Sequence, residues 1–319
     1  MKIDKLRVGV IGVGHLGEYH VQKYRNIPIV DLVGIVDANP ERADMIGQSY
    51  DARIFQGHKE LLKEVDAVSL VVPTTVHYEV AKDVLAQGVH LLIEKPITYK
   101  LEPANTLVAI AQEKNLVLQV GLVERFNPAV VKMESILDRP VFIEAQRMNK
   151  FTLRGTDADV VLDLMIHDLD IILHIVNSEI KELRAVGMSV TTDKTDIANA
   201  RIIFENGTVA TLTASRVSDK TIRKTRIFQP DCYMEVDFFK RKLSIARLGD
   251  VAGDPLKLAQ IKAENETFPD SDPLADEIKS FVYAVNNGRE PVVSGHDGRK
   301  ALKVSLDIIE LIKKGSKNF

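Results

Sequence analysis

Residues 6–17 read LRVGVIGVGHLG, an apolar run that passes into a glycine cluster and then into a helical pattern. In such a stretch Gly12 permits a tight turn, Gly14 lets a phosphate approach the backbone, and Gly17 lets the helix pack closely on the strand. The N–H groups at the helix start would then bind a pyrophosphate. The spacing predicts a dinucleotide-binding turn, although a glycine-rich turn that holds no cofactor could have the same residues.

Asp37 ends the next apolar run, about twenty residues after the glycine cluster. A carboxylate at this place can accept hydrogen bonds from both ribose hydroxyls of a dinucleotide and would repel a 2′-phosphate. No arginine stands directly beside Asp37, which favours NAD over NADP as the cofactor. Arg42 lies near enough in the sequence to leave NADP as the less favoured alternative.

Short apolar runs alternate with helical patterns as far as residue 121. The expected strands are Leu6–Ile11, Leu32–Val36, Ile54–Phe55, Ala67–Val72, Leu91–Ile93 and Leu116–Val120. The expected helices are His15–Tyr24, Glu41–Gln48, Val76–Ala86 and Pro103–Lys114. Strands this apolar are buried on both faces, which is typical of a parallel, doubly wound sheet. Residues 1–121 are therefore predicted to form an α/β Rossmann domain.

The pattern changes after Gly121. Longer strands are expected at Phe142–Arg147, Leu183–Val190, Ile202–Ser215 and Val236–Ile245, and late helices at Leu274–Val285 and Arg299–Lys313. Asn206-Gly207 predicts a hairpin turn within the third of these strands. We expect residues 122–319 to form an α+β domain with a large, mainly antiparallel sheet, whose last helix could pack back on the first domain. A half-exposed sheet face would suit a homodimer or homotetramer.

The bulk composition limits the classes of partner. The 319 residues carry a net charge of -3, with 27% charged and 45% apolar residues, so no basic stripe for nucleic acid is expected. No stretch is apolar for long enough to span a membrane, and charged residues begin at Lys2. Cys232 is the single cysteine, which excludes an intrachain disulfide. We expect a cytoplasmic protein.

Two motifs follow strands at the edge where open α/β sheets bind ligands. Glu94-Lys95-Pro96 ends the fifth expected strand, and its lysine could donate a hydrogen bond to a substrate hydroxyl or remove its proton. The alternative is a surface lysine beside a turn proline. After the fourth expected strand comes a second motif, in which Pro73 is expected to contact the cofactor and His77 to be either a helix-start residue or a polar group near the site.

A third motif lies in the apolar stretch Val160–Val176. On a helix, Asp163 and His167 would share a face, and a carboxylate beside an imidazole fixes its tautomer. The structural alternative is that His167 is a core histidine and that Asp163 caps the helix. His167, Asp170 and His174 have ligand-like spacing, but we expect no metal. At the domain junction, Arg125 and Asn127 could reach a polar or anionic substrate or could be purely structural.

Together these motifs resemble the glucose–fructose oxidoreductase/inositol dehydrogenase (Gfo/Idh/MocA) family over essentially the whole chain. The resemblance implies that Lys95, Asp163 and His167 are the catalytic set beside the nicotinamide. The residues expected to contact the cofactor are Gly12, Gly14, His15, Leu16, Gly17, Asp37, Pro73, Thr74, His77, Glu94 and Lys95. The residues expected to contact the substrate are Lys95, Arg125, Asn127, Asp163 and His167.

The segment at residues 123–128, VERFNP, is similar to a signature of family members that oxidise the 3-hydroxyl of UDP-N-acetylglucosamine. This resemblance implies a small sugar or nucleotide-sugar substrate and reversible hydride transfer to NAD, with His167 or Lys95 as the base. Two other interpretations stay open: a dehydrogenase of free sugars or inositol, and a regulator that binds NAD and a sugar without turnover.

Overall fold

The computed structural model describes residues 5–152, 158–230, 232–248 and 261–315. The residues of the chain group into two compact units. The first unit comprises Met1–Val123 and Asp272–Leu302, and the second comprises Glu124–Ser271 and Lys303–Phe319. The segment 272–302 thus groups with the first unit, whereas the sequence analysis assigned it to a second domain beginning at residue 122. Residues 1–4, which include Lys2, lie outside the described ranges.

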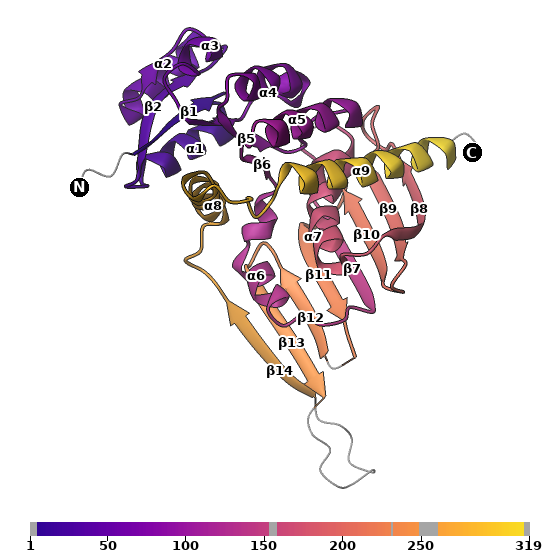
Figure 1. The fold of residues 1–319 in the computed structure, drawn as a ribbon. Helices are drawn as coiled ribbons and strands as arrows, with labels where there is room; N and C mark the ends of the chain where they lie inside the picture. The colour runs from indigo at the N-terminus through magenta and orange to yellow at the C-terminus, as the bar shows by residue number, and fades with distance from the viewer. Residues whose placement is uncertain (1–4, 153–157, 231, 249–260, 316–319) are drawn as a thin grey trace, which may run out of the picture. The chain divides into compact units, whose positions relative to one another are not determined.

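The first unit contains a six-stranded parallel sheet in the order β3-β2-β1-β4-β5-β6 (Figure 1). Its strands are β1 (Leu6–Ile11), β2 (Val30–Val36), β3 (Arg53–Ile54), β4 (Ala67–Leu70), β5 (His90–Glu94) and β6 (Leu118–Gly121). This order is that of a doubly wound dinucleotide-binding fold, with its ligand edge at the carboxyl ends of the strands. The Rossmann prediction is confirmed.

The helices of the first unit cover this sheet. They are α1 (His15–Arg25), α2 (Pro40–Tyr50), α3 (His58–Leu61), the 3₁₀ turn η1 (Thr74–Val76), α4 (His77–Ala86), α5 (Leu101–Glu113) and α8 (Pro273–Asn287). Ile278 and Phe281 of α8 belong to the same buried core as Val8 and Val10 of β1 and Val21 of α1. Helix α8 is therefore part of the core of the Rossmann unit, although it lies far from β1 in sequence.

The second unit is built on an eight-stranded sheet in the order β14-β13-β12-β11-β7-β10-β9-β8 (Figure 1). Its strands are β7 (Phe142–Met148), β8 (Ile180–Met188), β9 (Ile197–Phe204), β10 (Val209–Ser215), β11 (Ile222–Phe228), β12 (Cys232–Asp237), β13 (Lys242–Leu248) and β14 (Ile261–Thr267). Among the described strands of this sheet, only β7 and β10 pair in parallel. The predicted mainly antiparallel sheet is confirmed, and Gly207 turns the β9–β10 hairpin with a φ of 89°.

One strand prediction was wrong. The expected strand Val236–Ile245 is instead the end of β12, a turn and the start of β13. The turn forms because Arg241 adopts a positive φ of 49° and the Asp237 carboxylate accepts a hydrogen bond from the Lys240 N–H at 3.0 Å. Strands β11 and β14 were not predicted, because their many charged residues hide the alternation of apolar side chains.

Helical segments cover one face of the second sheet. They are the 3₁₀ turn η2 (Val123–Phe126), α6 (Pro128–Glu134), the π-helical turn η3 (Val161–Met165) and α7 (Ile166–Val176). Helix α6 packs on β12 and β13, η3 on β10 and α7 on β7. Helix α9 (Gly295–Gly315) begins in the first unit and ends in the second. Among the described residues, no helix is both long enough and apolar enough to cross a bilayer.

Candidate active site

The glycine turn after β1 has the geometry that the sequence predicted. Gly12 adopts a φ of 87°, and a Cβ there would collide with the Val71 backbone. A Cβ on Gly17 would collide with the Gly12 carbonyl, so this residue holds α1 close to β1. Within the part of the chain that the structure describes, a Cβ on Gly14 would meet nothing within 4 Å, and no side chain caps the start of α1. The N–H groups of this helix end are therefore open to an anionic ligand.

Asp37 lies directly after β2 and is tied to this turn. Its carboxylate accepts hydrogen bonds from the Val13 N–H at 2.7 Å and the Asn39 N–H at 2.8 Å. Arg42 donates to the Val13 carbonyl at 2.8 Å and pairs with Glu18 at 2.6 Å. The carboxylate is therefore oriented beside the glycine turn, while the Arg42 guanidinium already has partners within the protein.

The loop after β4 is anchored by His77, which is 1% exposed. One ring nitrogen lies 2.9 Å from the Val72 carbonyl oxygen and the other 3.0 Å from the Pro96 carbonyl oxygen. Burial lowers the pKa of His77, and the two carbonyls only partly oppose this shift. His77 therefore lies between two loops at the ligand edge, and its ring donates to one of these carbonyls when neutral and to both only when protonated. Pro73 is exposed beside it, and Thr74 is half-buried in η1.

Glu94 and Lys95 lie at the carboxyl end of β5 and are both half-buried. The Lys95 N–H donates to the Glu94 carboxylate at 3.3 Å, so this carboxylate helps to hold the backbone of the lysine. Glu94 Oε1 also lies 3.3 Å from His20 Nε2. Gly121 on the neighbouring strand leaves room for the carboxylate, because a Cβ there would lie 2.8 Å from Glu94 Oε1.

In the second unit, Asp163 and His167 stand out by their exposure. Every residue from 160 to 173 is buried except these two, which are both partly exposed. Asp163 lies in the π-helical turn η3, and His167 is the second residue of α7. The helix-start role that sequence alone could give Asp163 belongs to Asp159, whose carboxylate accepts from the Val161 N–H at 3.0 Å. Single π-helical turns are frequent at functional sites.

A buried ion pair lies directly behind His167. Asp168 binds Arg147 of β7 through two hydrogen bonds of 2.9 Å, and the same guanidinium donates to Glu124 at 2.8 Å. Burial would lower the pKa of Arg147, but attraction to Asp168 and Glu124 overcomes this and raises it. Arg223 of β11 stands opposite Arg147 in the sheet register.

Arg125 and Asn127 are both buried within the second unit. The Arg125 guanidinium lies 3.4 Å from Asp170 and 4.0 Å from Glu134. Asn127 accepts from the Ala129 N–H at 3.2 Å and so caps α6, and its amide donates to the Phe238 carbonyl at 3.3 Å. The sequence left open whether Arg125 and Asn127 contact a substrate or are structural, and these contacts favour a structural role. Contact with a substrate stays a prediction for both residues.

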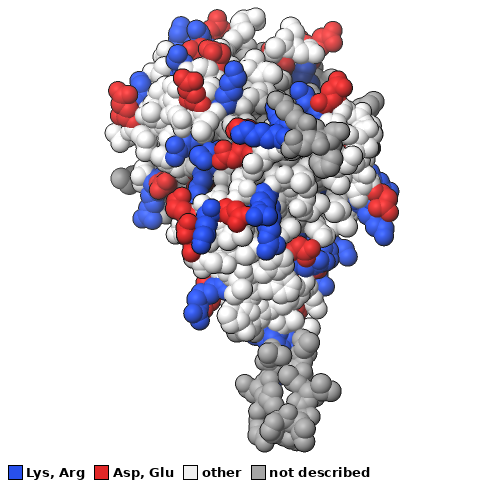
Figure 2. Space-filling model, turned by 90° about the vertical axis from the view of Figure 1, so that its right-hand side faces the viewer, with Lys and Arg blue, Asp and Glu red and all other residues white. Residues whose placement is uncertain are grey.

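The ligand-like spacing of His167, Asp170 and His174 does not produce a metal cluster. Asp170 faces Arg125, and His174 lies 3.8 Å from Glu134. Among the described residues, no group of three or more His, Cys, Asp or Glu side chains could hold a metal ion. On the face drawn in Figure 2, basic and acidic side chains are interspersed, as the near-neutral charge of the chain suggests.

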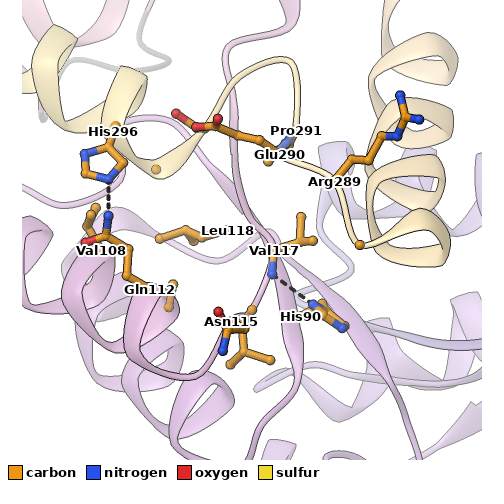
Figure 3. A pocket seen from close by; sticks show the side chains of 15 residues that line it. His90, Val108, Gln112, Asn115, Val117, Leu118, Arg289, Glu290, Pro291 and His296 are labelled. Carbon is orange, nitrogen blue, oxygen red and sulfur yellow. Dashed lines mark hydrogen bonds between the residues drawn. The ribbon is translucent and has the colours of Figure 1, made fainter.

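A pocket of about 540 Å³ lies in the first unit, away from the glycine turn (Figure 3). It adjoins His90 and Leu118, the first residues of β5 and β6, whereas Lys95 follows the last residue of β5. His90 Nδ1 accepts from the Val117 N–H at 2.9 Å, and His296 Nε2 lies 2.8 Å from the Gln112 amide nitrogen. This pocket is at the amino edge of the sheet and is not the predicted cofactor site.

Comparison with known proteins agrees with this geometry. The model of the oxidoreductase family with an NAD-binding Rossmann fold (Gfo/Idh/MocA) matches residues 6–122, and that of the Gfo/Idh/MocA C-terminal domain matches residues 129–229. The chain belongs to the Gfo/Idh/MocA family of oxidoreductases. The family resemblance of the sequence is thereby confirmed, as is an oxidoreductase built on an NAD-binding Rossmann fold.

Individual family members differ in how similar they are. The chain is 42% identical over 304 residues to a UDP-N-acetylglucosamine 3-dehydrogenase of Acidithiobacillus ferrooxidans, covering 95% of this chain and 96% of that one. A solved structure of that enzyme superposes with a TM-score of 0.90 over 97% of this chain and 98% of that chain, at 40% identity. The scyllo-inositol 2-dehydrogenase (NAD(+)) of Bacillus subtilis is 23% identical, covering 98% and 95% of the two chains.

Sequence analysis did not identify two buried ionisable residues, Arg147 and Glu277, although the sequence around each of them contains a pattern that could have indicated it. Arg147 follows Ile143 and Ala145 on the apolar face of β7, where a charged residue needs a buried partner. Glu277 of α8 lies one turn from Leu274 and Phe281, within the apolar stripe of the helix. In each case an ionisable residue stands on an otherwise apolar face.

Proposed function

We propose that this chain is an NAD-dependent dehydrogenase that oxidises the 3-hydroxyl of UDP-N-acetylglucosamine or of a close nucleotide sugar. The observation that carries the proposal is the 42% identity, over nearly the full length of both chains, to an enzyme of that name. The scyllo-inositol 2-dehydrogenase (NAD(+)) of Bacillus subtilis is much less similar, at 23% identity. The VERFNP segment at residues 123–128 supports the same choice of substrate.

The glycine turn and Asp37 fit the proposed cofactor. The open side of Gly14 and the uncapped start of α1, which His15 and Leu16 begin, would receive the pyrophosphate. Asp37 would accept the adenosine ribose hydroxyls and disfavour a 2′-phosphate. Because Arg42 is already paired with Glu18, it is poorly placed to offset that repulsion, which supports NAD over NADP. Pro73, Thr74 and Glu94 at the same edge would line the nicotinamide half.

Bound NAD would accept the hydrogen of the sugar carbinol carbon together with its electron pair. The proposed role of His167 is to take the hydroxyl proton, because an unperturbed imidazole titrates near neutral pH. Asp163 would orient that imidazole or a neighbouring hydroxyl. Lys95 would donate a hydrogen bond to the sugar oxygen and stabilise the negative charge that develops on it, or would itself serve as the base.

The substrate is tested by following NAD reduction with UDP-N-acetylglucosamine, its uronate, myo-inositol and glucose. We expect turnover with a nucleotide sugar and little or none with the free polyols. Turnover only with inositol or glucose would replace the proposed substrate with a free sugar. Tight binding of NAD and a sugar without any reduction, even in a single turnover, would instead indicate a regulator.

Replacing Lys95 by Ala should lower kcat by about 10²–10⁴-fold, the usual effect of losing an acid–base or charge-stabilising group. NAD affinity, measured by calorimetry, should change little. Lys59→Ala is the matched control, because the Lys59 side chain is 75% exposed on α3. Normal kcat in the Lys95 variant would contradict the role given to this lysine. A parallel His167→Ala variant, compared across pH, would show which of the two groups is the base.

Homo-oligomerisation and a cytoplasmic location are further parts of the proposal. The face of the second sheet away from α6 and α7 is half-exposed and carries the contacting rings of Phe142, Phe228 and Tyr233. A second copy of the chain could cover such a face. Light scattering coupled to size exclusion should give a dimer or tetramer, and a monomer would contradict this part. The single, buried Cys232 is compatible with a reducing compartment.

A further inference from the structure

The short segment that leads into η3 is bound through its backbone to other parts of the second unit. The Ala158 carbonyl accepts a hydrogen bond from the Arg216 guanidinium at 2.5 Å. The Val160 N–H donates to the Thr195 carbonyl at 3.0 Å. Val160 is fully buried, and the first N–H groups of a helix have no partner within it, so this acceptor satisfies a group that would be costly to leave alone.

Arg216 and Asp196 form a buried pair at the ends of two neighbouring strands. Arg216 directly follows β10, and Asp196 directly precedes β9. Arg216 Nε lies 3.7 Å from Asp196 Oδ1, and the Arg216 backbone N–H donates to the Asp196 carbonyl at 3.0 Å. Asp196 is 0% exposed and Arg216 is 6% exposed. The guanidinium therefore joins this pair to the segment before η3.

The Asp196 carboxylate also holds the loop between β8 and β9. Its Oδ2 accepts from the N–H groups of Val190, Thr191 and Thr192 at 2.7, 2.6 and 2.9 Å. Its Oδ1 accepts from the Thr192 hydroxyl at 2.7 Å. Burial would raise the pKa of Asp196, but these hydrogen bonds overcome that effect and lower it. They fix the loop that carries the Thr195 carbonyl.

The segment held in this way supports the first residues of the π-helical turn η3. The Asp163 N–H donates to the Asp159 carbonyl at 2.9 Å, and the Asp159 carboxylate accepts from the Val161 N–H at 3.0 Å. Turns of the π type are rare in proteins, because the backbone usually prefers the α-helical spacing. A displacement of residues 158–160 would therefore be passed to Asp163 through the backbone.

We propose that Asp196 and Arg216 are positioning residues for Asp163. They hold residues 158–160, from which η3 begins, and so set the place of Asp163 relative to His167. A guanidinium suits this role, because its N–H groups lie in a fixed plane and can bind a backbone carbonyl and face a carboxylate together. The effect on catalysis rests on the proposed function, whereas the restraint on the backbone does not.

Hydrogen–deuterium exchange of the full chain tests the restraint without any substrate. In Arg216→Met, peptides covering residues 158–167 should exchange about tenfold faster or more, because hydrogen bonds from a charged donor are lost. Peptides from β12 and β13 should exchange as in the wild type. Arg139→Met is the matched control, since the Arg139 side chain is 81% exposed. Unchanged exchange at residues 158–167, or equal acceleration throughout the second unit, would overturn the inference.

Kinetics with the proposed nucleotide sugar test the effect on catalysis. Arg216→Met should lower kcat by about ten- to a hundredfold, the scale expected when a reacting group is displaced by about 1 Å. KM for NAD should stay nearly unchanged, because the glycine turn and Asp37 belong to the first unit. Arg216→Lys should recover part of kcat, since its ammonium can still donate to the Ala158 carbonyl. Arg139→Met should keep the wild-type kcat.

Two kinetic results would contradict the positioning role: wild-type kcat in Arg216→Met, or an equal loss of kcat in the Met and Lys variants. If Arg216→Met does not fold, Thr192→Val decides, because it removes the hydroxyl donor to Asp196 and keeps the shape of the side chain. Exchange at residues 158–167 should then rise and kcat should fall, and no change in either would contradict the role. A wild-type protein inactive on every sugar would end the proposed function, while exchange would still decide whether the pair restrains this segment.

Discussion

The second unit buries Asp168 against a guanidinium, whereas the first unit buries Glu277 with no hydrogen-bond partner for its carboxyl among the described residues. Asp168 directly follows the candidate site residue His167, and Glu277 lies on the buried side of α8. Arg147 donates to both oxygens of Asp168, which favours the ionised carboxylate, whereas burial raises the pKa of Asp168. Burial raises the pKa of Glu277 well above its ordinary value, which favours the protonated acid.

The difference shows two ways in which a protein can keep a carboxyl group in its interior. An ion pair keeps the charge and orients it, but it makes the fold depend on both partners. A protonated carboxyl avoids the cost of a buried charge, but it makes the fold depend on pH. The two units should therefore respond differently to substitution and to pH, and the following predictions are ordered by the size of the expected effect.

Replacing Arg147 by Met should produce the largest change. It leaves Asp168 and Glu124 without their guanidinium, and breaking one side of a buried pair costs about 3–5 kcal/mol in the free energy of unfolding. Denaturant unfolding followed by circular dichroism measures this. Arg184→Met, on a side chain that is 79% exposed, is the control and should change stability by less than about 0.5 kcal/mol. A similarly small change in the free energy of unfolding for Arg147→Met would contradict a stabilising role of the ion pair.

The pH dependence of stability should reveal Glu277. Its pKa is raised in the folded protein, so the folded state holds a proton that the unfolded chain releases above a pH of about 4.3. The stability that this group contributes is therefore complete below that pH and declines as the pH rises, by at most about 1.4 kcal/mol per pH unit. Glu277→Gln should show a shallower decline between neutral and alkaline pH. Parallel curves for the two proteins would argue that Glu277 is ionised.

A smaller effect is expected at Ser69, which joins His20 to Tyr24. Ser69→Ala leaves a buried hydroxyl and a buried ring nitrogen without this partner, and unsatisfied groups of this kind cost about 1–3 kcal/mol. Adding Tyr24→Phe should cost little more, because it removes one of the orphaned groups. Thermal unfolding measures both variants. Full additivity of the two substitutions would mean that the hydroxyls act independently.

Much of the fold could be predicted from the sequence, because it depends on periodic patterns. The first sheet follows from apolar runs that alternate with helices, and the turn at Gly12 from the need for positive φ. The place of α8 could not be predicted, since an amphipathic helix shows which face is apolar but not which core receives it. Strand β11 was missed because charged residues such as Arg223 lie on both of its faces.

The candidate site could be predicted only in part. Asp37, Lys95, Asp163 and His167 follow strands or share a helix face, and such positions can be read along the chain. The buried residues that contact these positions cannot be predicted from the sequence. The contact of Asp168 with Arg147, for example, joins residues 21 positions apart through the packing of a helix on a sheet. For His77 the sequence gave two options, and the structure adds a third, a link between two backbone carbonyls.

The most direct test of the central claim is the fate of the hydrogen on C3 of the sugar. UDP-N-acetylglucosamine deuterated at C3 would be mixed with the protein and NAD, and the reduced cofactor analysed by mass spectrometry. The account predicts that the NADH formed carries the deuterium, and that the Lys95→Ala variant forms it far more slowly. Unlabelled NADH, or no NADH from this sugar while another substrate is oxidised, would contradict it.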